Sequence, residues 1–131
     1  MEIHSFTFNP FQENTYVLSD ETGECVIIDP GCYEPHEKKE LQDFIANKNL
    51  KVVKLINTHG HIDHVLGNDW VKNTFQVPFG IYEQDESTLK SVVTYADSYG
   101  FPAYKEAEVD FYINKEEGIS FGSTSLEVLF V

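Results

Sequence analysis

The spacing of hydrophobic residues predicts three short strands near the N-terminus. Residues 2–8 alternate between apolar and polar side chains, and Asn9-Pro10 then breaks the strand. Two further strands are expected at residues 14–19 and 25–28. The sequence Asp20-Glu21-Thr22-Gly23 between them favours a turn, so we expect these two strands to pair as a hairpin.

The next part of the chain predicts a helix between two strands. Leu41, Phe44 and Ile45 recur at helical spacing within residues 36–47. An apolar strand follows at residues 52–57. A helix of this length suits a crossover connection, so we expect a β-α-β unit with parallel strands.

The rest of the chain continues as a mixture of helices and strands. We expect a helix that is capped by Asp85 and runs to about residue 99, with Leu89, Val92, Val93 and Ala96 facing inward. The other expected elements are a helix at 65–75 and strands at 77–82, 109–113, 119–121 and 125–131. The pattern is that of an α/β protein, and 131 residues make one domain or part of one.

Composition excludes several classes of function. The net charge is −13 and all nine cationic residues are lysines, which argues against binding to nucleic acid. No apolar run approaches the length needed to span a membrane, and nothing marks export, so we expect a cytoplasmic protein without a membrane partner. Cys25 and Cys32 do not form a CxxC pair, and no disulfide framework is indicated.

Candidate chemistry is concentrated in Thr58-His59-Gly60-His61-Ile62-Asp63-His64, directly after an expected strand. Imidazole and carboxylate groups are ligands for zinc and iron, so this segment is predicted to be a metal-binding loop, hereafter the metal loop. In an extended segment His59, His61 and Asp63 would share one side. The spacing suits two neighbouring metals, with His59 and His61 on one and Asp63 and His64 on the other.

Two features bear on this interpretation. We expect Gly60 to let the backbone turn tightly between ligands. The simpler alternative is a chance cluster of surface histidines, but six residues that contain this pattern arise by chance only about once in ten thousand chains of this size.

The metal loop resembles the metal-binding motif of the metallo-β-lactamase-fold hydrolases, and in particular the glyoxalase II-like (hydroxyacylglutathione hydrolase-like) branch. Residues 9–18 and the segment Val26-Ile27-Ile28-Asp29-Pro30-Gly31 agree with this family as well. The resemblance implies an αββα sandwich, of which residues 1–131 form the first half plus the opening strands of the second half. It also implies further ligands downstream, but no histidine follows His64, so the domain looks truncated at its C-terminus.

The resemblance further implies a hydrolase with two metal ions, zinc first and iron or manganese as alternatives, that acts on a small-molecule thioester, ester or related carbonyl compound. Asp63 would be the catalytic residue as well as a ligand. Asp29, Asn14 and Thr58 would support the metal loop through hydrogen bonds, although an Asp-Pro-Gly turn alone also explains Asp29.

The departure from the family leaves other outcomes open. The missing C-terminal half or a second chain would complete the site, and we expect this chain alone to be inactive. The alternative functions are an iron-dependent persulfide (sulfur) dioxygenase on the same fold and an inactive metal-binding fragment.

Overall fold

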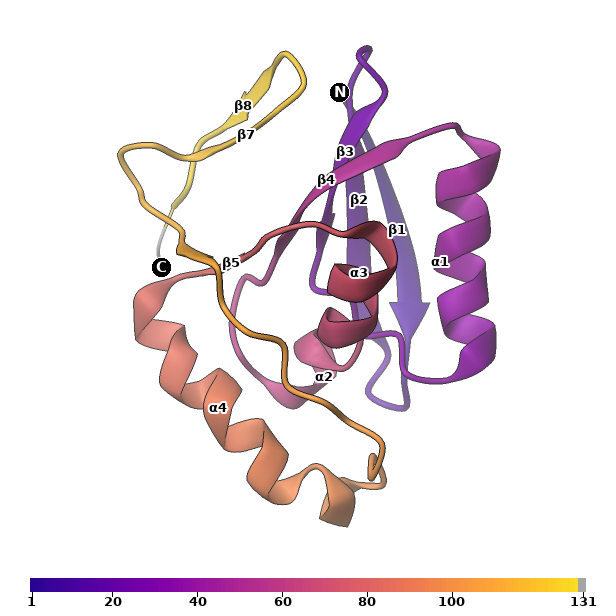
Figure 1. The fold of residues 1–131 in the computed structure, drawn as a ribbon, viewed down its shortest axis with the longest axis vertical. Coiled ribbons are helices and arrows are strands. Elements are labelled where there is room, and N and C mark those ends of the chain that lie inside the picture. Colours follow the sequence, from indigo (N-terminus) through magenta and orange to yellow (C-terminus); the bar gives the residue numbers. More distant parts are fainter. Residues whose placement is uncertain (130–131) are drawn as a thin grey trace.

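The computed structural model describes residues 1–129, which form a six-stranded mixed sheet in the order β1-β2-β3-β4-β5-β6 (Figure 1). The first two pairs are antiparallel and the remaining three are parallel. This confirms the predicted hairpin and the predicted β-α-β unit. The strands are β1 (Glu2–Phe8), β2 (Glu13–Ser19), β3 (Glu24–Ile28), β4 (Lys51–Ile56), β5 (Phe79–Ile81) and β6 (Phe111–Tyr112).

The four α-helices of residues 1–129 pack on one face of this sheet, where their apolar residues join a single core cluster. The helix that links the parallel strands β3 and β4 begins at a capping box in which Glu34 and Glu37 exchange hydrogen bonds. Pro35 is the first residue of this helix. The helices are α1 (Pro35–Asn47), α2 (Ile62–Val65), α3 (Asn68–Phe75) and α4 (Glu86–Tyr95), with short 3-10 turns η1 (Glu83–Asp85) and η2 (Asp97–Tyr99) around the last.

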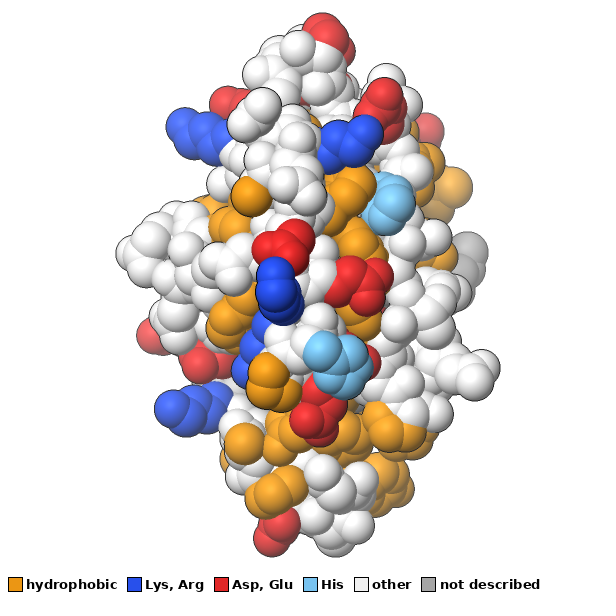
Figure 2. All heavy atoms as spheres, turned by 90° about the vertical axis from the view of Figure 1, so that its right-hand side faces the viewer, with side chains coloured by type: hydrophobic (Ala, Val, Ile, Leu, Met, Phe, Trp, Pro, Cys, Tyr) orange, Lys and Arg blue, Asp and Glu red, His pale blue; other side chains and the backbone are white. Residues whose placement is uncertain are grey.

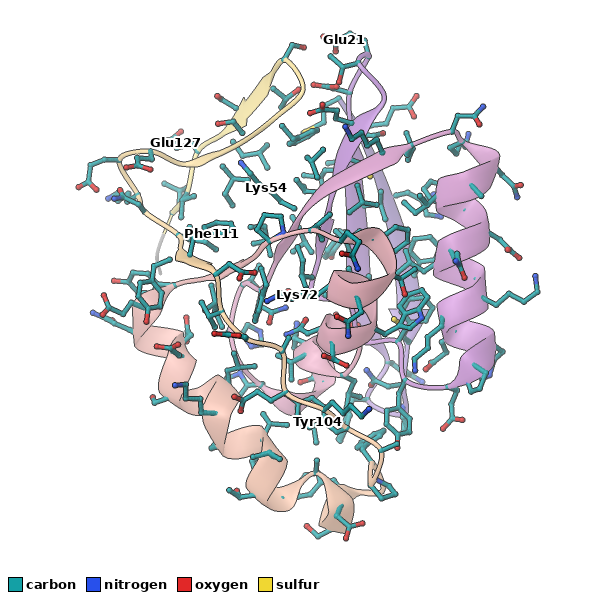
Figure 3. All side chains as sticks on the ribbon, viewed as in Figure 1. Glu21, Lys54, Lys72, Tyr104, Phe111 and Glu127 are labelled. Atoms are coloured by element: carbon teal, nitrogen blue, oxygen red, sulfur yellow. The ribbon has the colours of Figure 1, made fainter. Side chains whose placement is uncertain are left out.

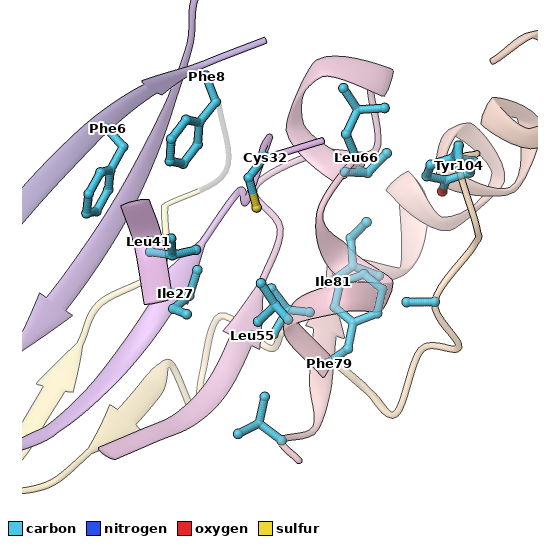
Figure 4. Packing of buried hydrophobic residues seen from close by; sticks show 14 of the residues in the cluster. Phe6, Phe8, Ile27, Cys32, Leu41, Leu55, Leu66, Phe79, Ile81 and Tyr104 are labelled. Carbon is cyan, nitrogen blue, oxygen red and sulfur yellow. The ribbon is translucent and has the colours of Figure 1, made fainter. Parts of the chain in front are cut away.

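The core lies between the sheet and the helices (Figure 4). Leu41 of α1, Ile27 of β3 and Leu55 of β4 are fully buried there, and Phe79 of β5 extends the same cluster. Burying one such side chain contributes about 1.5–3 kcal/mol relative to leaving it in water. The end of β4 is therefore held rigidly, which matters because the metal loop follows it.

A two-stranded hairpin of β7 (Ile119–Phe121) and β8 (Thr124–Leu126) lies over the opposite face of the sheet (Figure 1). Phe121 packs there against Val26, and Lys54 donates a hydrogen bond from Nζ to the Ser120 carbonyl oxygen at 2.6 Å (Figure 3). Helices, sheet and hairpin form three layers, and the predicted α/β fold class is confirmed.

The structure differs from the expected elements in several places. The helix expected at 65–75 is two helices, α2 and α3, and the first of them begins three residues earlier. Asp85 occupies the cap position of α4 but its side chain makes no capping hydrogen bond, because it belongs to η1. The prediction that Val93 faces the core is wrong, since 55% of this residue is exposed. The last expected strand is shorter, and residues 130–131 lie outside the described part.

The surface carries both signs of charge. Acidic and lysine side chains are interspersed on the face that lies at the right of Figure 1 (Figure 2). Among residues 1–129, no helix combines the length and the apolar character that crossing a membrane requires.

Candidate metal centre

The metal loop leaves the carboxyl end of β4 and turns directly into α2. His59 is half-buried and lies at a bend of the loop, whereas His61 is exposed and has an extended backbone. Asp63 and His64 lie in the first turn of α2, for which His61 is the N-cap residue. The loop is therefore not one extended segment, and the last two side chains reach the site from a helical turn.

The four predicted ligands nevertheless lie side by side. Nδ1 of His59 and Nδ1 of His61 face each other at 2.7 Å. Nε2 of His64 lies 3.3 Å from Oδ2 of Asp63. The ring centroids of His59 and His64 are 3.9 Å apart, so the two pairs form one continuous cluster.

The two half-buried histidines have opposite tendencies to ionise. Burial, followed by positive charge on His64, lowers the pKa of His59, which keeps this ring neutral. Burial also opposes charge on His64, but the hydrogen bond to Asp29 and the charges of Asp29 and Asp63 outweigh it and raise the pKa of His64. A neutral His59 is free to bind metal, whereas His64 gives up a proton first.

Asp29 connects β3 to the metal loop. Its carboxylate accepts hydrogen bonds from the Thr58 N–H at 2.7 Å and from the Thr58 hydroxyl at 2.5 Å. Its Oδ2 also lies 3.1 Å from Nδ1 of His64. The backbone of Asp29 is left-handed, with φ at 55°, a conformation that Asp and Asn tolerate better than most residues. The structure thus brings together Asp29 and Thr58, although their role towards a metal stays a prediction.

Asn14 lies elsewhere, because strand alternation places its exposed side chain on the opposite side of β2 from Glu13 and Thr15. Its supporting role stays a prediction. Sequence reasoning missed Glu13 and Thr15, the two neighbours of Asn14, both of which are buried. The signal for their inward direction is that Glu13, Thr15 and Val17 follow one another at intervals of two residues along one strand.

Behind the metal loop lies a second group with metal-binding chemistry. Glu13, Asp29 and His64 each place one donor atom within 4.8 Å of the others. Burial, followed by the charge of Asp29, raises the pKa of Glu13 to about 9, although the contact with Thr15 acts to lower it. His64 therefore stands between two carboxyl groups on its Nδ1 side and Asp63 on its Nε2 side.

Three asparagines hold the metal loop in place through side-chain hydrogen bonds. Asn57 and Asn68 are fully buried, and Nδ2 of Asn68 donates to Oδ1 of Asn57 at 2.6 Å. Nδ2 of Asn57 also donates to the His64 carbonyl oxygen at 3.3 Å. Nδ2 of Asn9 donates to the carbonyl oxygens of Gly31 and Asp63 at 3.1 and 3.0 Å. These bonds fix α2 relative to three segments of the sheet.

Gly60 has a different purpose from the expected tight turn. A Cβ at this position would lie 2.5 Å from the Leu89 backbone nitrogen and 2.8 Å from the Asp85 carbonyl oxygen. Glycine is needed because α4 packs directly on the backbone of the metal loop.

The side chains present fit a metal centre of zinc or iron type. Three imidazoles and one carboxylate are ligands that these metals accept, and the facing nitrogens of His59 and His61 suit a cation that replaces the proton between them. Nδ1 of His64 faces Asp29, so Nε2 of the same ring faces Asp63.

Comparison with known proteins identifies the family of the chain. A family model described as the Metallo-beta-lactamase superfamily matches residues 8–129. Hydroxyacylglutathione hydrolase GloC of Haemophilus influenzae is 30% identical over 98% of this chain and 60% of its own length. The chain spans 56–60% of the length of three curated relatives that it matches.

Solved structures show the same fold. The B3 metallo-beta-lactamase BLEG-1 superposes with a TM-score of 0.76 at 23% identity, over 93% of this chain and 57% of that protein. TTHA1623, solved in a di-iron-bound form, superposes with a TM-score of 0.71 at 25% identity, over 90% of this chain and 56% of that protein.

Proposed function

The chain belongs to the metallo-β-lactamase superfamily of metal-dependent hydrolases, and from this premise we propose that it supplies the metal-binding half of a glyoxalase II-like hydrolase. The proposed substrate is a small thioester, ester or related carbonyl compound. The observation that carries the proposal is the convergence of His59, His61, Asp63 and His64 at the end of β4.

In this proposal His59 and His61 hold one metal ion while Asp63 and His64 hold the other. Bound metal ions would supply an activated water at neutral pH and polarise the scissile carbonyl. The residues of the chain orient the centre: Asp29 fixes Thr58 and His64, and Asp63 offers an acceptor for a water proton. Zinc is the first choice, and the di-iron form of TTHA1623 supports iron as the alternative.

The loop offers two side chains to each metal, whereas catalytic zinc sites have about three protein ligands. We therefore propose that further polypeptide completes the site, from the same protein or from a second chain. The chain contains no histidine after His64, so the remaining imidazoles are not in its later strands.

The test is a measurement of metal bound by the 131-residue chain after loading with zinc or with ferrous iron. We expect the metal held by His59 and His61 to be lost in His61→Ala and retained in His36→Ala, a matched control outside the metal loop. Equal binding by both variants would contradict the proposed site. Hydrolysis of a glutathione thioester by the isolated chain is expected to stay near background, and rapid turnover would refute the need for further ligands.

A further inference from the structure

Glu13, the first residue of β2, is a fully buried carboxyl group with an incomplete set of partners. Its side chain has no exposed surface, and Oε1 lies 3.7 Å from Nδ1 of His64. This oxygen has no hydrogen bond to any described residue. A buried polar atom without a partner is costly, so its place behind a metal-loop residue calls for a reason.

The hydrogen bonds of Thr15 define the state in which Glu13 is held. The Thr15 hydroxyl lies 3.0 Å from the Gly31 nitrogen, 2.8 Å from the Asp29 carbonyl oxygen and 2.9 Å from Oε2 of Glu13. A hydroxyl has one hydrogen to donate and two lone pairs. The Gly31 N–H donates and the Asp29 carbonyl only accepts. All three contacts are therefore satisfied only when Glu13 donates an O–H to Thr15.

This arrangement holds the Asp29–Gly31 turn, from which the Asp29 carboxylate reaches His64. Nδ1 of His64 faces that carboxylate at 3.1 Å, whereas Oε1 of Glu13 lies 3.7 Å away, beyond hydrogen-bond distance. A carboxylate beside Nδ1 favours a hydrogen on this atom and leaves the lone pair on Nε2. Nε2 is the atom that faces Asp63.

We propose that Glu13 is a positioning residue, which holds Thr15 and the Asp29–Gly31 turn so that His64 keeps its hydrogen on Nδ1 and presents Nε2 to the metal centre. The inference rests on the proposed function and adds a residue to the site.

The rival explanation is that Glu13, Asp29 and His64 bind a cation directly. The geometry disfavours it, because the Asp29 carboxylate already accepts two hydrogen bonds from Thr58. Oε2 of Glu13 is likewise engaged with Thr15. The two explanations differ in what they require of residue 13: a direct ligand needs a negative charge, whereas a positioning residue needs one donor and one acceptor.

Glutamine supplies that donor and acceptor without charge, so Glu13→Gln is the matched control for Glu13→Leu. The ring nitrogens of His64 are first observed by ¹⁵N NMR in the metal-free chain, at a pH at which the His64 ring is neutral. We expect the Nδ1–H tautomer in the wild type and in Glu13→Gln, and a mixture of tautomers in Glu13→Leu. Thr15→Val, which removes the same link, should give a mixture as well if Glu13→Leu does not fold.

Cobalt binding, followed by its visible absorption, gives the second measurement. We expect the wild type and Glu13→Gln to bind alike and Glu13→Leu to bind at least about tenfold more weakly. The proposal is overturned if Glu13→Leu matches the wild type, or if Glu13→Gln is impaired as much as Glu13→Leu. A wild-type chain that binds no cobalt would refute the metal site instead, while the tautomer of His64 still tests Glu13.

Discussion

At the scale of single residues, the donors of the metal loop lie beside two buried carboxyl groups, Glu13 of β2 and Asp29 at the end of β3. His59, His61, Asp63 and His64 are apparent because imidazoles are rare and closely spaced. Glu13, by contrast, reads as one more carboxylate in an acidic chain. Its burial depends on strand pairing across the sheet, which local pattern does not define.

Asp29 provides a direct test of the support behind the metal loop. Asn keeps the shape of Asp and tolerates its left-handed backbone, but it loses the charge beside His64. We expect Asp29→Asn to weaken zinc binding by about 10–100-fold while the chain stays folded. Calorimetric titration measures this, with the exposed Asp43→Asn as the control. Unchanged affinity in Asp29→Asn would show that Asp29 is only a turn residue.

The pH dependence of stability reports the state of Glu13 in the metal-free chain. Its pKa is raised from 4.5 to about 9 in the folded protein, so the folded state holds a proton that the unfolded state releases. The free energy of unfolding should therefore fall as the pH rises between these values, by at most about 1.4 kcal/mol per pH unit. The raised pKa of His64 acts in the same direction above its ordinary value.

Denaturant titrations across this pH range, with a chelator present, measure the slope. In Glu13→Gln no carboxyl group has to lose its proton, so the slope should be smaller than in the wild type. An equally steep slope in both proteins would show that Glu13 does not cause it.

At the scale of elements, period and turn chemistry predicted the order of strands and helices well. The hairpin of β2 and β3 and the α1 crossover followed from short-range pattern, because each depends on neighbouring residues. The start of α2 did not follow from short-range pattern. Ile62 is the first residue of this helix, and its side chain is buried in the core. Gly60 was assigned to a tight turn, whereas the packing of α4 explains it.

Gly60→Ala tests the packing between the metal loop and α4. The added methyl group meets backbone atoms of Asp85 and Leu89, which have little room to move. We expect a loss of about 1–3 kcal/mol in the free energy of unfolding. Gly100→Ala is a useful comparison because its Cβ would meet open space, although its backbone is left-handed. Denaturant unfolding compares the variants, and wild-type stability in Gly60→Ala would contradict the close approach.

At the scale of the whole molecule, the layered fold and the charge have separate causes. Helices cover one face of the sheet and the β7–β8 hairpin lies over the other. The family resemblance predicted this arrangement, whereas the hydrophobic pattern alone indicated only an α/β protein. The chain spans 56–60% of the length of three curated relatives, so the complete centre stays a proposal.

The net charge of −13 makes a prediction about salt. Repulsion among the carboxylates destabilises the compact state, and added ions screen it. Raising sodium chloride from about 0.01 M to about 0.5 M should increase the free energy of unfolding by on the order of 1 kcal/mol. Urea denaturation at each salt concentration measures this. A decrease would indicate that attractive ion pairs, such as Lys72 with Asp110, outweigh the repulsion.

The residues that fasten the metal loop have a consequence for synthesis. Asn9, Asp29, Asn57 and Asn68 all precede β5 in the chain. The ribosome synthesises the N-terminal residues first, at about 5–20 residues per second. The residues that hold the imidazole cluster are therefore all available on the nascent chain before α4 is synthesised, and α4 packs against Gly60 afterwards.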